Sequence, residues 1–180
     1  GQEMALRDRI AYTLAPHKLT WLTIDMTYKP ANWYTYGPIA DICACDDYVD
    51  PWRAAQVFST VQTACAACVP QMPVFIFRAW WQEPLKPKPG KKIGRFPFAA
   101  EERLYIHWAL AAGAQGLVSY IHCTERPKGS ISHGAEEYPD AWYEIGRCYR
   151  QIETIAPVLA TSVPADELTL TADKPVFCRA

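Results

Sequence analysis

The stretch PVFIFRAW, residues 73–80, is apolar at nearly every position and shows no regular alternation of apolar and polar side chains. A strand of this kind is buried on both faces, which is typical of a parallel sheet covered by helices. Three further stretches share this character: LTWLTIDM (19–26), DICAC (41–45) and GLVSYIH (116–122). The sequence therefore predicts four strands of a parallel sheet.

Segments with helix start and stop residues separate these strands. The helices are predicted, in chain order, over residues 4–14, 52–68, 98–112 and 139–157. Asp50-Pro51 provides a cap and a proline for the start of the second helix, and Pro157 is predicted to end the last one. The link between the first two strands has room for only a turn or a very short helix. This alternation favours right-handed β/α crossovers.

Four strands are half of the eight that close a TIM (β/α)8 barrel. We therefore predict an α/β fold in which residues 1–163 form the C-terminal half of such a barrel, with outer helices and a missing N-terminal half. Residues 164–180 are predicted to begin a following β segment. The missing half is expected from an upstream part of the same polypeptide, a second copy, or another chain, because an open sheet exposes two edges.

Composition excludes several classes of partner. The net charge is −1, from 18 basic and 19 acidic residues, which gives no electrostatic basis for binding nucleic acid. No apolar run has the ~18–20 residues that membrane insertion requires. The first seven residues do not resemble a signal peptide, so an extracellular or periplasmic location would require an upstream signal.

The seven cysteines are predicted to be reduced thiols, because an odd number cannot form a closed set of disulfides within one chain. A zinc site built from Cys43, Cys45, Cys65 and Cys68 is the alternative. The C-x-C pair points both sulfurs to one face of a strand but lacks a knuckle turn. We expect no metal and no cofactor.

Three stretches resemble glycoside-hydrolase-like TIM barrels, particularly bacterial proteins of the β-galactosidase-type clan. They are IADICACDDY (39–48), MPVFIFRAWWQ (72–82), and FPFAAEERL (96–104) continued by GAQGLVSY (113–120). They are similar to the sixth strand, the seventh strand, and the helix that enters the eighth strand. The resemblance spans about residues 21–160 and implies the C-terminal half of such a barrel.

The resemblance also implies a nucleophilic carboxylate at the end of the seventh strand and an acid/base carboxylate at the end of the fourth. The fourth strand has no counterpart in this sequence. Glu83 is the carboxylate nearest to the end of the matching seventh strand, although it falls a few residues late and precedes Pro84.

In β/α barrels the functional residues follow the C-terminal ends of the strands. Glycoside hydrolysis needs two carboxyl groups, and aromatic faces can stack on sugar rings. The catalytic candidates are Glu83, Asp46 and Asp47. The candidates for binding substrate are Tyr48, Trp80, Trp81, Tyr120, His122 and Asp25. The predicted function is hydrolysis of glycosidic bonds, with carbohydrate as the ligand.

Structural roles remain open for several candidates. Asp46 and Asp47 could serve only to orient a turn, and Glu83 lies beside a loop rich in proline and lysine. Trp80 and Trp81 cannot both face the barrel interior, because neighbours on a strand point opposite ways. An ion pair with Arg78 could explain Asp25, and His122 could be a core histidine. The alternative function is a non-catalytic carbohydrate-binding or structural module of a larger extracellular assembly.

Overall fold

A computed structural model of the chain describes residues 2–25, 31–84, 94–122 and 130–161. Its main sheet has four parallel strands that lie side by side in chain order. They are β1 (Trp21–Asp25), β2 (Ile42–Asp46), β3 (Met72–Arg78) and β5 (Gly116–Tyr120). The predicted α/β class and the parallel sheet are confirmed, and the arrangement is consistent with half of a barrel.

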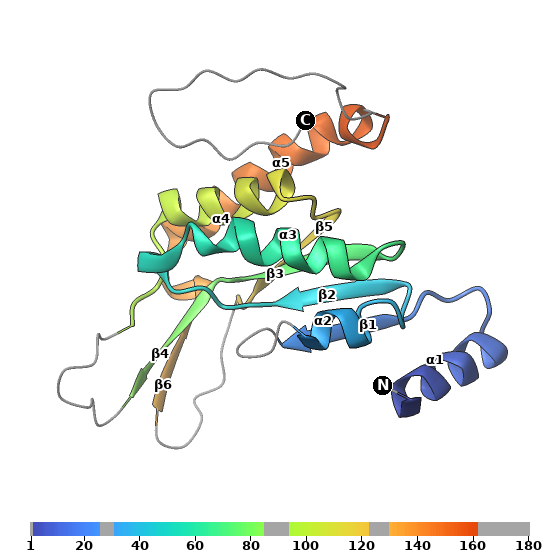
Figure 1. The fold of residues 1–180 in the computed structure, drawn as a ribbon. Coiled ribbons are helices and arrows are strands. Elements are labelled where there is room, and N and C mark those ends of the chain that lie inside the picture. The colour runs from blue at the N-terminus through green and yellow to red at the C-terminus, as the bar shows by residue number, and fades with distance from the viewer. Residues whose placement is uncertain (1, 26–30, 85–93, 123–129, 162–180) are drawn as a thin grey trace.

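In the described part of the chain, five α-helices and two short 3₁₀ helices accompany the sheet. They are α1 (Gln2–Leu14), α2 (Ala31–Tyr36), η1 (Pro51–Arg53), α3 (Gln56–Cys68), α4 (Ala99–Ala111), η2 (Ala135–Glu137) and α5 (Pro139–Thr161). Figure 1 shows α3, α4 and α5 layered on one face of the sheet, while α1 stands apart beyond β1. The short helix expected between the first two strands is α2.

The predicted end of the last helix at Pro157 is wrong, because α5 continues through it to Thr161. A proline inside a helix removes one hydrogen bond and crowds the carbonyl one turn earlier. Side chains 153–161 are exposed, so water can satisfy the carbonyl that loses its partner.

The two faces of the sheet explain why its strands are apolar throughout. Cys43, Cys45, Phe75 and Phe77 belong to the core shared with the helices. The alternate residues of the same strands, Ala44, Val74 and Ile76, form a second buried cluster on the opposite face of the sheet. Burying a large apolar side chain contributes about 1.5–3 kcal/mol, so both clusters stabilise the sheet.

A second, two-stranded antiparallel sheet extends from the ends of the parallel strands. It pairs β4 (Trp80–Pro84) with β6 (Ser130–Gly134), and Figure 1 shows it projecting away from the helices. Stacking of Trp81 on His133, with ring centroids 4.8 Å apart, joins the two strands. The sequence analysis missed this two-stranded sheet, because β4 continues the apolar run of β3 and β6 lies in a polar segment.

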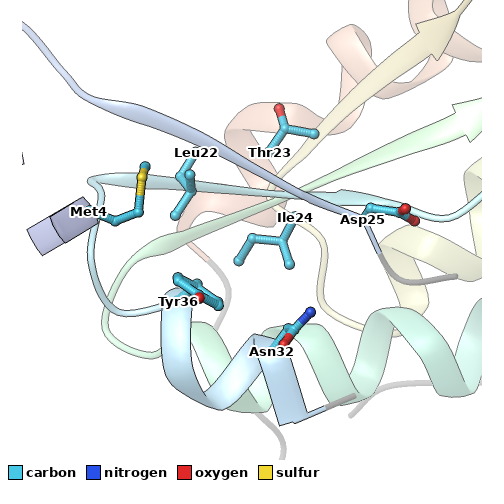
Figure 2. Close-up of a pocket in the computed structure, with 7 residues that line it drawn as sticks. All are labelled: Met4, Leu22, Thr23, Ile24, Asp25, Asn32 and Tyr36. Atoms are coloured by element: carbon cyan, nitrogen blue, oxygen red, sulfur yellow. The ribbon is translucent and has the colours of Figure 1, made fainter. Parts of the chain in front are cut away.

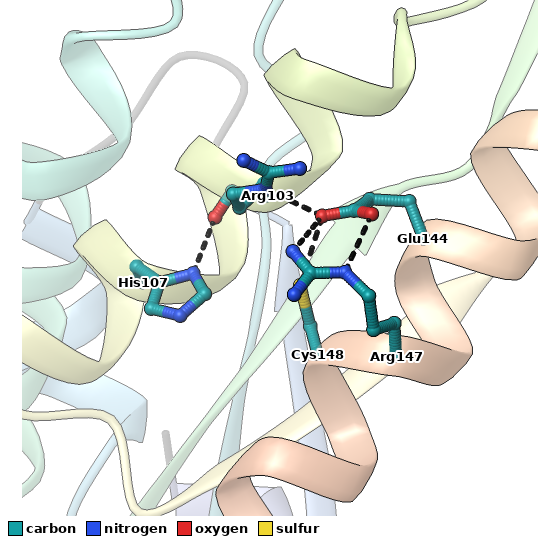
Figure 3. Close-up of polar contacts among 5 residues, drawn as sticks. All are labelled: Arg103, His107, Glu144, Arg147 and Cys148. Atoms are coloured by element: carbon teal, nitrogen blue, oxygen red, sulfur yellow. Dashed lines mark hydrogen bonds and ion pairs between the residues drawn. The ribbon is translucent and has the colours of Figure 1, made fainter.

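A charged cluster joins α4 to α5 (Figure 3). The Glu144 carboxylate accepts hydrogen bonds from Arg103 of α4 and from Arg147 of its own helix. These two guanidinium groups lower the pKa of Glu144 to about 2. His107 hydrogen-bonds the Arg103 carbonyl oxygen through Nδ1 at 2.8 Å. The cluster fixes one helix against the other at the surface of the domain.

Gly37, which follows α2, lies so close to neighbouring backbone that alanine cannot fit without movement. A Cβ atom there would lie 2.6 Å from the Trp33 carbonyl oxygen and 3.2 Å from that of Ala67. We expect Gly37→Ala to lower the free energy of unfolding by about 1–3 kcal/mol, as overpacked substitutions do. Urea denaturation would measure this change.

Gly146→Ala is the matched control. The nearest atom to a Cβ at Gly146 is Arg150 Nη1 at 3.6 Å, so the helix has room for the methyl group. Alanine should stabilise α5 by about 0.5–1 kcal/mol through its helix propensity. Equal effects of the two substitutions would show that the close contact at Gly37 is unimportant.

Both edges of the main sheet are open in the described part of the chain, since β1 and β5 each have a single neighbour. On the face opposite the helices, Trp21 is 48% exposed and Met72 is 37% exposed. Among the described helices, none combines the length and the apolar character needed to cross a membrane. The predicted β segment at 164–180 lies outside the described residues.

Candidate functional site

The C-terminal ends of the four parallel strands place several of the predicted site residues along one edge of the sheet. Asp25 and Asp46, the last residues of β1 and β2, are register partners. Arg78 and Tyr120, the last residues of β3 and β5, are also register partners. Because the strands are parallel, these charged and aromatic side chains come together from positions far apart in the sequence.

Three rings form what we call the aromatic cluster: Tyr48, Trp80 and Tyr120. The Tyr48 and Tyr120 ring centroids are 5.5 Å apart, with an angle of 31° between the rings. The Trp80 ring stands nearly perpendicular to both, with centroids 5.8 Å from Tyr48 and 6.4 Å from Tyr120. The cluster thus has a corner shape, made by two roughly aligned rings and a third at right angles.

Asp46 lies beside the aromatic cluster and is chemically unusual. Burial raises the pKa of its carboxyl, the charge of Asp25 adds to the rise, and a hydrogen bond with the Tyr48 side chain opposes it. Its Oδ1 atom is buried and has no hydrogen-bond partner within the described part of the chain. Asp46 therefore holds a proton more readily than an exposed aspartate.

Asp47 points away from Asp46, as expected for neighbouring residues in an extended segment. Its side chain hydrogen-bonds to Thr60, a buried residue of α3, and the charge of Arg53 lies near it. Burial nevertheless raises the pKa of Asp47. The structure therefore joins Asp46 to the aromatic cluster and places Asp47 against α3.

Trp81 and His122 lie apart from the aromatic cluster. Trp81 donates from Nε1 to the Tyr138 hydroxyl at 2.8 Å. As the sequence analysis required, the neighbouring tryptophans face different surroundings. The His122 ring packs on Trp142 of α5, with centroids 4.6 Å apart. Glu83 belongs to β4, but its side chain lies outside what the structure describes.

Arg78 has a partner that the sequence analysis did not predict. An ion pair with Arg78 was one open explanation for Asp25, whereas the salt bridge of Arg78 in the described part of the chain is to Asp50, with 2.6 Å between Nη1 and Oδ1. Its Nε also donates to the Trp80 carbonyl oxygen at 2.8 Å. An arginine inside an otherwise apolar strand was the available signal that this position is special.

A separate cavity of about 420 Å³ lies along β1 (Figure 2). Ile24 points from β1 toward Asn32 and Tyr36 of α2, whereas Thr23 points to the other side of the strand. Residues from both faces of β1 therefore line the cavity, which follows the open edge of the sheet. The cavity wall mixes apolar residues with polar ones such as Thr23, Asp25 and Asn32. The aromatic cluster is the better candidate for chemistry because it combines three rings with the buried carboxyl of Asp46.

The cysteines do not form a metal site in the described residues, where no group of three or more His, Cys, Asp or Glu side chains is arranged to hold an ion. Cys43, Cys45 and Cys68 are buried free thiols between β2 and α3. Burial raises the pKa of Cys45, and a hydrogen bond with Cys43 together with burial raises that of Cys68. Protonated thiols of this kind are poor zinc ligands.

We compared the chain with known proteins by sequence and by structure. No family model matches it. Neither a curated protein nor a solved structure is significantly similar to it. The functional argument therefore depends on the chemistry of the site described above.

Proposed function

We propose that the chain binds carbohydrate at the aromatic cluster and belongs to a glycoside-hydrolase-like barrel. The observation that carries this proposal is the meeting of three aromatic rings with Asp46 at the C-terminal edge of a parallel sheet. Sugar rings offer apolar C–H faces together with hydroxyl groups. The aromatic rings can pack against the C–H faces, and the neighbouring carboxyls can hydrogen-bond to the hydroxyl groups.

The carboxyl groups support a hydrolytic role for the same site. Asp46, which retains a proton readily, is suited to be a general acid that protonates the leaving oxygen. Asp25 is its register partner on the next strand, and adjacent strands lie about 4.8 Å apart. Carboxyl pairs separated by about 5–5.5 Å occur in retaining glycosidases. The strand register thus offers Asp25 as the second carboxyl, whereas the family resemblance implies Glu83 as the nucleophile; the two are alternatives for the same role.

Completion of the barrel is part of the proposal. Within the described residues, no strand pairs with the outer edge of β1, which borders the cavity of about 420 Å³. The open edge of β5 is the second place where a neighbouring strand could pair. Another half-barrel joined at both edges would cover Trp21 and Met72 on the exposed face. It would also supply any carboxylate that this half lacks.

A non-catalytic carbohydrate-binding module is the second candidate. Its support is the position of Asp47, whose side chain hydrogen-bonds to Thr60 of α3. Asp47 therefore does not join Asp46 as a second carboxyl at the aromatic cluster. A binding module needs the rings but does not need a pair of catalytic carboxyls. The glycosidase and the binding module would both bind carbohydrate, but only the glycosidase would hydrolyse it.

Titration calorimetry with lactose, cellotriose and maltotriose tests carbohydrate binding. We expect at least one of these sugars to bind and Trp80→Ala to weaken its binding about tenfold, which corresponds to about 1.4 kcal/mol. Trp142→Ala is the control, because Trp142 packs on His122 away from the aromatic cluster. Binding that Trp80→Ala leaves unchanged would exclude the cluster as the site.

Hydrolysis separates the two candidates. Release of nitrophenol from nitrophenyl glycosides by the wild-type chain, and its loss in Asp46→Asn, would support the glycosidase. Sugar binding that depends on Trp80, without any turnover, would instead support the binding module. Failure of all three sugars to bind would contradict the proposal in this form.

A further inference from the structure

Arg78 is a nearly buried cation at the end of the central strand β3. Its side chain is 11% exposed, and the strand before it is almost entirely apolar. A charge in such a position is costly unless it is paired and hydrogen-bonded. Arg78 meets this requirement through its bonds to the Asp50 carboxylate and to the Trp80 carbonyl oxygen.

These bonds join segments that are distant in the sequence. Asp50 immediately precedes η1, in the connection that follows β2, and Trp80 is the first residue of β4. Gly94, ahead of α4, is also close, because a Cβ atom placed there would lie 3.9 Å from Arg78 Nη2. The guanidinium group therefore lies where three connections meet above the sheet.

The path of the backbone shows why Trp80 depends on this contact. Ala79 still pairs with β5, since its N–H donates to the Tyr120 carbonyl oxygen at 2.6 Å. Trp80 is where the chain leaves the parallel sheet and begins β4 of the two-stranded antiparallel sheet. The guanidinium carbon of Arg78 also lies 5.8 Å from the centre of the Trp80 ring. Arg78 thus contacts both the carbonyl group and the ring of the residue at this junction.

We infer that Arg78 is a positioning residue, which holds Trp80 perpendicular to Tyr48 and Tyr120 in the aromatic cluster. Its effect on ligand binding rests on the proposed carbohydrate function, whereas the positioning of Trp80 does not. Lysine cannot replace it, because one ammonium group lacks the planar fork that reaches Asp50 and the Trp80 carbonyl together. The Asp50 carboxylate accepts a hydrogen bond from Nη1 of Arg78, while Nε donates to the Trp80 carbonyl oxygen.

Near-ultraviolet circular dichroism of the free chain tests the positioning. The difference between wild type and Trp80→Phe isolates the signal of Trp80 among the seven tryptophans. We expect Arg78→Lys to lose most of this signal while the far-ultraviolet spectrum is retained. Arg103→Lys, at an ion pair on the other side of the helices, should leave the signal unchanged. A wild-type signal in Arg78→Lys would overturn the inference.

Asp50→Asn provides a second variant, in case Arg78→Lys does not fold. It keeps the shape of the side chain, removes the charge that fixes Arg78, and should weaken the same Trp80 signal. An unchanged signal in this variant would also count against the positioning role.

Sugar titrations extend the test to ligand binding. For whichever of lactose, cellotriose and maltotriose binds the wild type, we expect Arg78→Lys to raise Kd about tenfold. Arg103→Lys should leave Kd unchanged. If no sugar binds the wild type, the proposed function fails and circular dichroism still decides the role of Arg78. An altered Trp80 signal with an unchanged Kd would separate Trp80 orientation from binding and overturn the ligand part of the inference.

Discussion

Replacing Glu102 with glutamine is expected to make the protein more stable at pH 8 and to leave its stability at pH 4 nearly unchanged. Glu102 lies in the first turn of α4 and is 0% exposed. Neither of its carboxylate oxygens has a hydrogen-bond partner among the described residues. Glutamine has nearly the shape of the protonated acid and cannot ionise.

The charges around Glu102 determine the direction of this effect. Burial raises its pKa far above the usual value, Glu101 adds to the rise, and the charge of Arg78 on β3 opposes it. The hydroxyl groups of Tyr105 on α4 and Tyr149 on α5 are the other titratable neighbours. The folded state therefore keeps the proton at pH values where the unfolded chain has released it.

Because the folded pKa of Glu102 is raised, the contribution of this group to stability is most favourable below about pH 4.5 and declines as the pH rises toward the folded pKa. Glu102→Gln should remove this decline and add about 1–4 kcal/mol at pH 8, the range found when poorly satisfied buried charges are replaced. Urea denaturation from pH 4 to pH 8 measures it. Glu153→Gln, on the exposed part of α5, should follow the wild type.

Parallel curves for wild type and Glu102→Gln would contradict this account. They would mean that Glu102 ionises in the folded protein as easily as in the unfolded chain. The buried environment of the carboxyl would then have no thermodynamic consequence.

Phe75→Ala is expected to lower the free energy of unfolding by about 3–5 kcal/mol, as such deletions do in close-packed cores. Phe75 is 0% exposed at the centre of β3, with its ring centroid 6.4 Å from that of Phe77. Domains of ordinary stability unfold with about 5–15 kcal/mol, so the variant should lose a large fraction of the total. Chemical denaturation at constant pH measures the loss.

Tyr12→Ala is the control for this prediction. Tyr12 is 61% exposed on α1, a helix that contributes no buried residue. Its removal should change stability by less than about 0.5 kcal/mol. Similar losses from the two substitutions would show that the core of the sheet is not the main source of stability.

The parallel sheet could be predicted because its signal is local and repeated. The strand centred on Phe75 is apolar on both faces, and the structure shows separate buried clusters on each side. Asp50-Pro51 marks a helix start close to where η1 begins. Such patterns depend on burial and backbone chemistry that act within a few residues.

The two-stranded antiparallel sheet and the end of α5 depend on features that the sequence does not display locally. Only Ala79 separates β3 from β4, so the change of partner occurs within one apolar run. The continuation of α5 through Pro157 occurs where the side chains of the helix are exposed. Predicting either feature would have required knowledge of which distant segments lie nearby.

The sequence identified residues of the candidate site more successfully than it identified the contacts that those residues make. Tyr48, Trp80 and Tyr120 do meet, because the ends of parallel strands share one edge. The role of Arg78 was missed, since its partner Asp50 lies 28 positions away and only the fold brings the two together. Selecting Asp46 over Asp47 likewise required the position of Thr60.

The buried thiols can report how often the folded core of the protein opens. Cys43, Cys45, Cys68 and Cys148 are at most 2% exposed, and the pKa values of the last three are raised. Alkylating reagents and disulfide oxidants attack accessible thiolates, so these sulfurs can react only after β2 separates from α3 or α4 from α5. The rate of their modification would therefore report how often the native core opens, without any added label.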